Sequence, residues 1–100
     1  MSVNTVESPG GNEVVLKVSG RFDFSCHQDF INGYKAYPPG AKGYVVDLSQ
    51  TEFMDSSAMG MLLQLREYGD KEAGVSLVNG SNSIKDILRI ANFDKLFTIG

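Results

Sequence analysis

The fold is decided by residues 44–68, which read YVVDLSQTEFMDSSAMGMLLQLREY. The run that opens this stretch, Tyr44–Leu48, is short, nearly continuously apolar and rich in valine. Such a run is typical of a strand that is buried on both faces of a sheet. Residues 49–52, which come next, are polar, and we expect them to form a loop.

A helix is predicted to begin at Asp55 or Ser56 and to end before Gly69. Aspartate is a good N-cap, because its carboxylate accepts hydrogen bonds from amides of the first turn. At about 100° per residue, the helix face that must pack on the sheet carries Ala58, Met61, Leu62, Leu65 and Gly69. The opposite face carries Ser56, Gly60, Leu63 and Glu67, with Met59 at its border. An outward leucine and methionine beside a serine indicate a surface that another protein contacts.

Strands and helices alternate along the rest of the chain. Strands are predicted over residues 2–6, 13–18, 75–78 and 96–99. A first helix is predicted after Ser25-Cys26-His27-Gln28, which fits a capping box, and a last helix after residues 79–82. Gly20 is expected to end the second strand. We therefore expect one α/β domain over residues 1–100, with a mixed sheet of four to five strands and about three to four helices packed on it.

The composition excludes several classes of function. The net charge is −3 and the nine basic residues are scattered, whereas nucleic acids and anionic membranes require clustered Lys and Arg. The single cysteine, Cys26, and the single histidine, His27, cannot supply a disulfide or a zinc ligand set. We expect no signal peptide, and no apolar run approaches the ~20 residues that span a bilayer. We expect a cytoplasmic protein with no cofactor, no nucleic-acid partner and no membrane partner.

Catalysis by this chain is not expected. Ser56 does not lie in a G-x-S-x-G motif, because Met54 takes the place of the first glycine. His27 is the only candidate base, and a surface histidine is the simpler interpretation. No glycine-rich nucleotide-binding motif is present, so the chain fits a substrate of a kinase better than a kinase. Cys26 lies beside a helix start and is either an activated thiolate or, as is usual, an inert thiol.

Two segments, residues 45–49 and 53–63, resemble the signature of the STAS domain family. The family pattern is a strand ending in Asp-Leu-Ser, a short loop, and then aromatic-Met-Asp-Ser-Ser/Thr-Gly-Leu-Gly. The resemblance extends to residues 20–23 and 92–97 and so covers most of the chain. Within the family, the chain looks most like the anti-sigma factor antagonists of partner-switching pathways. It departs from the pattern at Ala58-Met59, which stands in place of Gly-Leu and leaves the partner specificity open.

The resemblance implies a phosphorylation switch at Ser56, the serine that directly follows the motif aspartate. In such antagonists an anti-sigma factor with a GHKL-type kinase fold phosphorylates this serine, and a PP2C-type phosphatase removes the phosphate. The unphosphorylated form binds the kinase, and the phosphorylated form releases it. Asp23 matches an acidic residue near the acceptor, although it could equally be a turn residue. The residues expected to bind the partner are Asp23, Asp55, Ser57, Met59, Gly60, Leu63 and Glu67, of which Ser57 is usually not the main acceptor.

The start of a helix is a favourable place for a phosphate. Unpaired backbone N–H groups and the positive end of the helix dipole meet there, so we expect a phosphoryl group on Ser56 to find donors. It also adds a charge of about −1.5 to −2 next to Asp55, which should disturb an apposed partner. On local features alone, a serine at a helix start is usually just a cap. Two other functions stay open: a constitutive STAS-like subunit of a lipid-transport ABC system, and a small-ligand sensor at the sheet edge.

Overall fold

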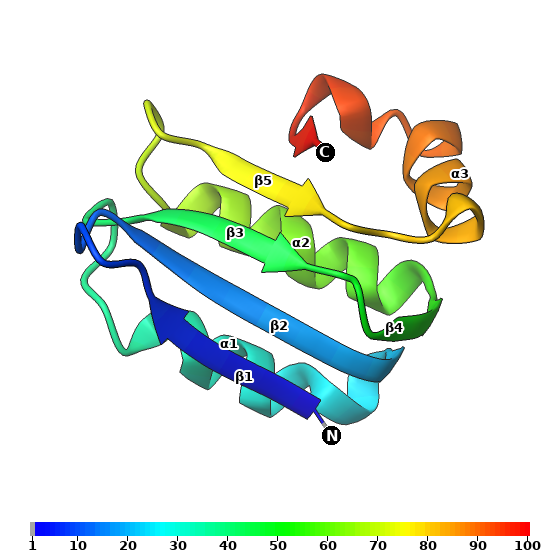
Figure 1. Ribbon diagram of the computed structural model, residues 1–100, viewed down its shortest axis with the longest axis horizontal. Helices are drawn as coiled ribbons and strands as arrows, with labels where there is room; N and C mark the ends of the chain where they lie inside the picture. Colours follow the sequence, from blue (N-terminus) through cyan, green and yellow to red (C-terminus); the bar gives the residue numbers. More distant parts are fainter. Residues whose placement is uncertain (1) are drawn as a thin grey trace.

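Parallel and antiparallel strands share one sheet in the computed structural model, which describes residues 2–100 (Figure 1). Five strands lie in the order β1-β2-β3-β5-β6, and β4 pairs with β2 beside this path. The strands are β1 Ser2–Glu7, β2 Glu13–Phe22, β3 Gly43–Asp47, β4 Thr51–Met54, β5 Val75–Val78 and β6 Thr98–Ile99. The helices are α1 His27–Lys35, α2 Ser56–Tyr68 and α3 Asn82–Ile90, with 3-10 turns η1 Phe24–Cys26 and η2 Phe93–Lys95. Among the described strands only β1 runs antiparallel to its neighbour, so the predicted mixed α/β sheet is confirmed.

Gly20 bends β2 instead of ending it, so the predicted end of this strand is wrong. The φ angle of Gly20 is +77°, in the left-handed region that glycine adopts without steric cost. The pairing register with β4 shifts between Gly20 and Arg21, where Glu52 of β4 is left as the extra residue of a β-bulge. Beyond the bulge the strand continues to Phe22 and pairs with β4. The bend therefore creates the short parallel pair at whose end the candidate site lies.

The strand β4 begins inside residues 49–52, which the sequence analysis wrongly assigned to a loop. Its burial does not alternate, because Thr51 and Met54 are buried while the residues between them are exposed. No period-two pattern therefore marks this strand in the sequence. Thr51 links β4 to β2, since its buried hydroxyl donates to the carbonyl oxygen of Val18 at 2.7 Å.

The helices α1 and α2 pack against each other and lie behind the sheet in Figure 1. The predicted packing face of α2 is confirmed, since its buried residues are Ala58, Met61, Leu62 and Leu65. Gly69 follows the helix as its C-cap, and a Cβ atom there would lie 3.0 Å from the ring of Tyr44, so a side chain would require the ring to shift slightly. The helix α3 lies near the end of β5, away from β1 and α1 (Figure 1). Within residues 2–100, no helix is long and apolar enough to cross a membrane.

Candidate functional site

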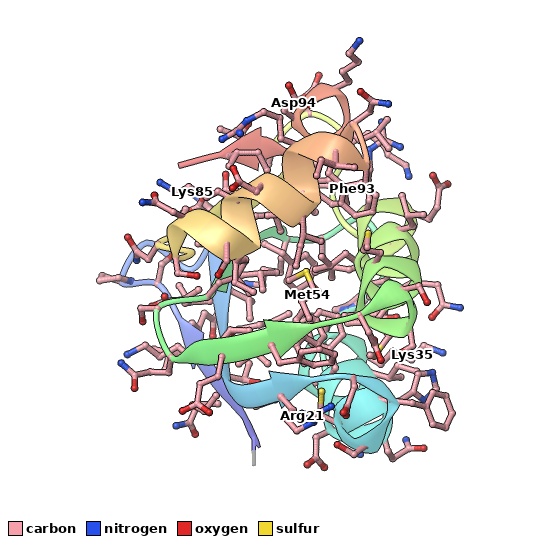
Figure 2. The ribbon with its side chains drawn as sticks, turned by 90° about the vertical axis from the view of Figure 1, so that its right-hand side faces the viewer. Arg21, Lys35, Met54, Lys85, Phe93 and Asp94 are labelled. Atoms are coloured by element: carbon pink, nitrogen blue, oxygen red, sulfur yellow. The ribbon has the colours of Figure 1, made fainter. Side chains whose placement is uncertain are left out.

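Two strand ends lie next to each other at one edge of the domain. In the parallel pair of β2 and β4, Phe22 is the register partner of Met54. The next residues along the chain are Asp23 and Asp55, and each of these caps a helix. Because they follow register partners in adjacent parallel strands, Asp23 and Asp55 lie at the same edge of the sheet. Figure 2 looks onto this edge, with Arg21 of β2 below Met54 of β4.

Asp55 caps α2, as the sequence predicts. Its Oδ1 atom accepts from the amide of Ser57 at 3.0 Å and from the amide of Ala58 at 3.2 Å. The hydroxyl of Ser57 donates to the same oxygen at 2.6 Å. This hydroxyl above all, and then the two amides, hold the pKa of the Asp55 carboxyl below its ordinary value. The side chain is therefore ionised at neutral pH, and it fixes the first turn of α2.

Asp23 makes a matching cap at the end of β2. Its Oδ1 atom accepts from the amide of Ser25 at 3.0 Å and from the hydroxyl of Ser25 at 2.5 Å. Those bonds, the hydroxyl first, lower the pKa of the Asp23 carboxyl. The predicted capping box is therefore wrong, because Ser25 lies in the 3-10 turn η1 that precedes α1 and serves Asp23. The other member of that predicted box, Gln28, donates to the side chain of Asn32 instead.

Ser56 is the first residue of α2 and is exposed. It takes no part in the cap, whereas the part-buried neighbour Ser57 gives both its amide and its hydroxyl to Asp55. The amides of Ser57 and Ala58 are thus already occupied by the Asp55 carboxylate. This corrects the expectation that a phosphoryl group on Ser56 finds open donors there: it would compete with Asp55 for them.

The outward face of α2 extends from Ser56 toward the other end of the helix. Gly60, Leu63 and Glu67 are exposed along it, while Met59 is half-buried against the core. A Cβ atom at Gly60 would meet no other atom within 4 Å, so nothing in the fold requires a glycine there. Glu67 pairs with Lys71 at 3.3 Å and with Arg66 at 3.7 Å, and both pairs are exposed to solvent. This face is open for a second protein to approach closely at its centre.

The sequence did not point to three residues of this edge, which are Arg21, Phe24 and Phe53. Arg21 pairs with Asp23 at 3.2 Å, and its guanidinium lies 4.2 Å from the ring centre of Phe53. Phe24, the middle residue of the first cap, is 68% exposed and stacks on His27 with 4.7 Å between ring centres. The pattern Asp-x-Ser occurs at residues 23–25, 47–49 and 55–57. It marks the turn but not the exposure of its middle residue, since Leu48 is buried whereas Phe24 and Ser56 are exposed.

A groove of about 490 Å³ runs between α1 and α2 on the outward side of the two helices. It is lined by His27, Ile31, Tyr34, Lys35, Gln64, Glu67 and Tyr68. His27 is also the residue on which Phe24 stacks, and Glu67 belongs to the outward face of α2. The groove therefore connects His27, next to the first cap, with the last turns of α2.

Cys26 is not an activated thiolate. The residue is buried, and burial is the main factor that raises the pKa of its thiol. A protonated and shielded thiol is a poor nucleophile, so the interpretation of Cys26 as an inert thiol holds.

Comparison of the sequence with known protein families and with individual proteins identifies the family of this chain. The family profile described as "Mlab, STAS domain" matches residues 6–98. The chain belongs to the STAS domain family. A STAS-domain containing protein of Pseudomonas aeruginosa (strain UCBPP-PA14) is 43% identical over 100 residues, which cover 99% of this chain and 99% of that protein.

Solved structures of anti-sigma factor antagonists share the fold. An anti-sigma factor antagonist from Mycobacterium paratuberculosis is 25% identical, with a TM-score of 0.75 over 98% of this chain and 85% of that chain. The anti-sigma factor antagonist SpoIIAA of Bacillus, in its unphosphorylated form, is 20% identical, with a TM-score of 0.69 over 99% of this chain and 87% of that chain. Its phosphorylated form, also 20% identical, has a TM-score of 0.64 over 99% and 91% of the two chains. The STAS-like α/β fold predicted from the sequence is confirmed.

Proposed function

We propose that this STAS domain is an anti-sigma factor antagonist whose binding to a serine kinase is switched by phosphorylation of Ser56. The observation that carries the proposal is that the adjacent serines Ser56 and Ser57 have different structural roles. Ser57 is committed to the helix cap, whereas Ser56 is exposed and is not part of the cap. The similarity to anti-sigma factor antagonists, one of which has been solved in phosphorylated form, supports the same function.

The proposed transfer requires that a kinase bring ATP to the start of α2. The Oγ atom of Ser56 attacks the γ-phosphorus of ATP, an O–P bond forms, and the bond from that phosphorus to ADP breaks. The hydroxyl proton passes to a base of the kinase. Afterwards a charge of about −1.5 to −2 lies against the carboxylate of Asp55 and the remaining phosphates of ADP. Like charges in a closed contact repel, so the kinase lets go.

Gly60 supports a contact on this face. A glycine inside a helix costs about 1 kcal/mol relative to alanine, and no atom of the fold fills the space beside Gly60. Gly60 lies on the same helix face as Ser56, about one turn further along. Retaining a glycine at this cost is reasonable where another backbone must come close to the helix.

Phosphate transfer to variants tests the assignment. The kinase is purified from the native cell by following transfer of phosphate from ATP to the wild-type chain. We expect one phosphate on the wild type, none on Ser56→Ala, and one on the matched control Ser57→Ala. Full phosphorylation of Ser56→Ala would show that the acceptor is another residue.

Binding of the same kinase tests the switch. Ser56→Asp places a charge at the contact and should weaken the complex by about 2 kcal/mol or more, the scale for an unpaired charge in an interface. A PP2C-type phosphatase should restore the affinity of the phosphorylated wild type. Equal affinities of wild type and Ser56→Asp would remove the basis for the switch.

A constitutive subunit of a lipid-transport ABC system is the second candidate. One observation favours it: the amides that would hold a phosphate are occupied by Asp55, so the start of α2 is complete without modification. In that case the chain should copurify with its partner in constant ratio whether or not ATP is present. It should also carry no phosphate on Ser56 in the native cell.

A further inference from the structure

We infer that Phe24 is the apolar anchor of the surface that the serine kinase covers, and that the kinase provides an apolar pocket for its ring. This inference rests on the proposed function, because it names a second part of the same contact. The side chain belongs to a different element from Ser56 and comes from the end of β2 rather than β4.

The position of Phe24 results from the pairing of the two strands. Phe22 and Met54 are register partners, and each is followed by an aspartate cap, a middle residue and a serine. Phe24 is the middle residue of one cap and Ser56 is the middle residue of the other. Both are exposed, so a protein that covers Ser56 meets Phe24 at the same edge of the domain.

The exposure of Phe24 has no explanation within the described residues of the fold. A phenylalanine with 68% of its surface exposed contributes little to the core, and neither its amide nor its ring is needed for the cap that Asp23 makes with Ser25. The ring stacks on His27 at an interplanar angle of 20°, which covers one side and leaves the other open. Aromatic side chains of this kind are typical anchors of protein interfaces.

The size of the contact also requires a second element. The helix α2 has 13 residues, so it is about 20 Å long, and a strip about 10 Å wide along it offers roughly 200 Å². A specific complex buries about 800 Å² on each partner. The groove between α1 and α2, which reaches from Glu67 to His27, continues the surface from α2 to Phe24. The partner therefore extends over the first cap.

Binding of Phe24→Ala to the kinase tests the inference. The kinase is the one purified by phosphate transfer to the wild type, and it is loaded with ADP. We expect Phe24→Ala to bind at least about 30-fold more weakly than wild type, the loss typical of an interface anchor. The matched control is Ile90→Ala, which removes a side chain that is 82% exposed on α3, and it should bind within about twofold of wild type. Phe24→Leu keeps an apolar side chain and should recover most of the loss.

The outcomes separate this inference from the proposed function. Melting temperatures show that each variant is folded before its affinity is compared. If wild type is phosphorylated on Ser56 and Ser56→Asp releases the kinase, but Phe24→Ala binds like wild type, the inference is overturned and the switch stands. Loss of self-association in Phe24→Ala, measured by size-exclusion chromatography with kinase binding unchanged, would assign the ring to a second copy of this chain and overturn it as well. If wild type is not phosphorylated on Ser56, the proposed function fails and this inference, which names the same kinase as partner, fails with it.

Discussion

Two strand ends in this domain carry the same cap and differ in the residue at its centre. At residues 23–25 and again at 55–57, the serine gives its amide and its hydroxyl to the aspartate. The middle residue is Phe24 in the first cap and Ser56 in the second. In both caps these bonds leave out the middle residue, which is exposed, whereas in the similar turn at residues 47–49 the middle residue Leu48 belongs to the core. The comparison shows how one local structure can present an apolar ring and a hydroxyl at the same edge.

The two caps open helical elements of very different length. The first begins the three-residue turn η1, and the second begins the 13-residue helix α2 with its open outward face. The second cap also accepts one more amide, from Ala58. We therefore expect the second cap to matter more for stability, and its position beside α2 to decide which middle residue is modified.

The largest expected effect comes from moving the acceptor to the first cap. The double variant Phe24→Ser, Ser56→Ala copies Asp-Ser-Ser to residues 23–25 and removes the original acceptor. We expect phosphorylation to fall at least about 100-fold, since misplacing a reacting group by ~1 Å already costs that much. The measurement is phosphate incorporation by the purified kinase, with Ser56→Ala as the matched control. Efficient phosphorylation at position 24 would mean that the local sequence, and not the face of α2, directs the kinase.

The second effect is on stability. Asp55→Ala removes the acceptor of two amides and one hydroxyl, and should lower the free energy of unfolding by about 1–2 kcal/mol. Asp23→Ala should cost less, about 0.5–1 kcal/mol, because its cap holds only a short turn. Urea unfolding measures both, and Asp55→Asn and Asp23→Asn are the matched controls, since asparagine caps equally well. Equal losses at the two positions would contradict the expected difference.

The smallest effect is on the pH dependence of stability. The pKa of the Asp55 carboxyl is lowered from 3.8 by the bonds it accepts, so the unfolded chain binds more protons than the folded one in acid. The stability that ionised Asp55 contributes is therefore fully present when the pH is above the pKa of the unfolded chain. It is lost as the pH falls through the lower pKa of the folded chain. Asp55→Asn keeps a cap but cannot titrate.

Urea unfolding from about pH 3 to pH 7 measures this dependence. The free energy of unfolding of the wild type should fall relative to that of Asp55→Asn as the pH decreases. A difference that stays constant over this range would show that the Asp55 carboxyl does not titrate differently in the folded and unfolded chains.

The sequence predicts most of the sheet and the whole of α2, but not the connection between them. The strand Tyr44–Leu48 and the packing face of α2 follow from apolar periodicity, which the structure confirms within one residue at the strand. The strand β4 could not be predicted in this way, because its burial does not alternate. It depends on pairing with β2 at Gly20–Phe22, about 30 residues earlier in the chain, and such a long-range partner leaves no local pattern.

Of the two caps that form the candidate site, the sequence predicted the one at Asp55 and not the one at Asp23. The carboxylate cap of Asp55 and the exposure of Ser56 follow from helix geometry, and both are found. The first cap was assigned to Ser25 and Gln28, because a capping box and an Asp-x-Ser cap look alike when the intervening 3-10 turn is not recognised. Phe24 was therefore not assigned to the site. Its place beside Ser56 depends on the pairing of β2 with β4, which only the structure reveals.

Mapping the phosphate on the chain taken from its native cell tests the central claim most directly. Trypsin releases residues 43–66 as one peptide, which contains both Ser56 and Ser57. Fragmentation in the mass spectrometer distinguishes the two serines. We predict a single phosphate, on Ser56, in part of the population. A phosphate on Ser57 instead, or a peptide that is never phosphorylated in growing or resting cells, would contradict the account.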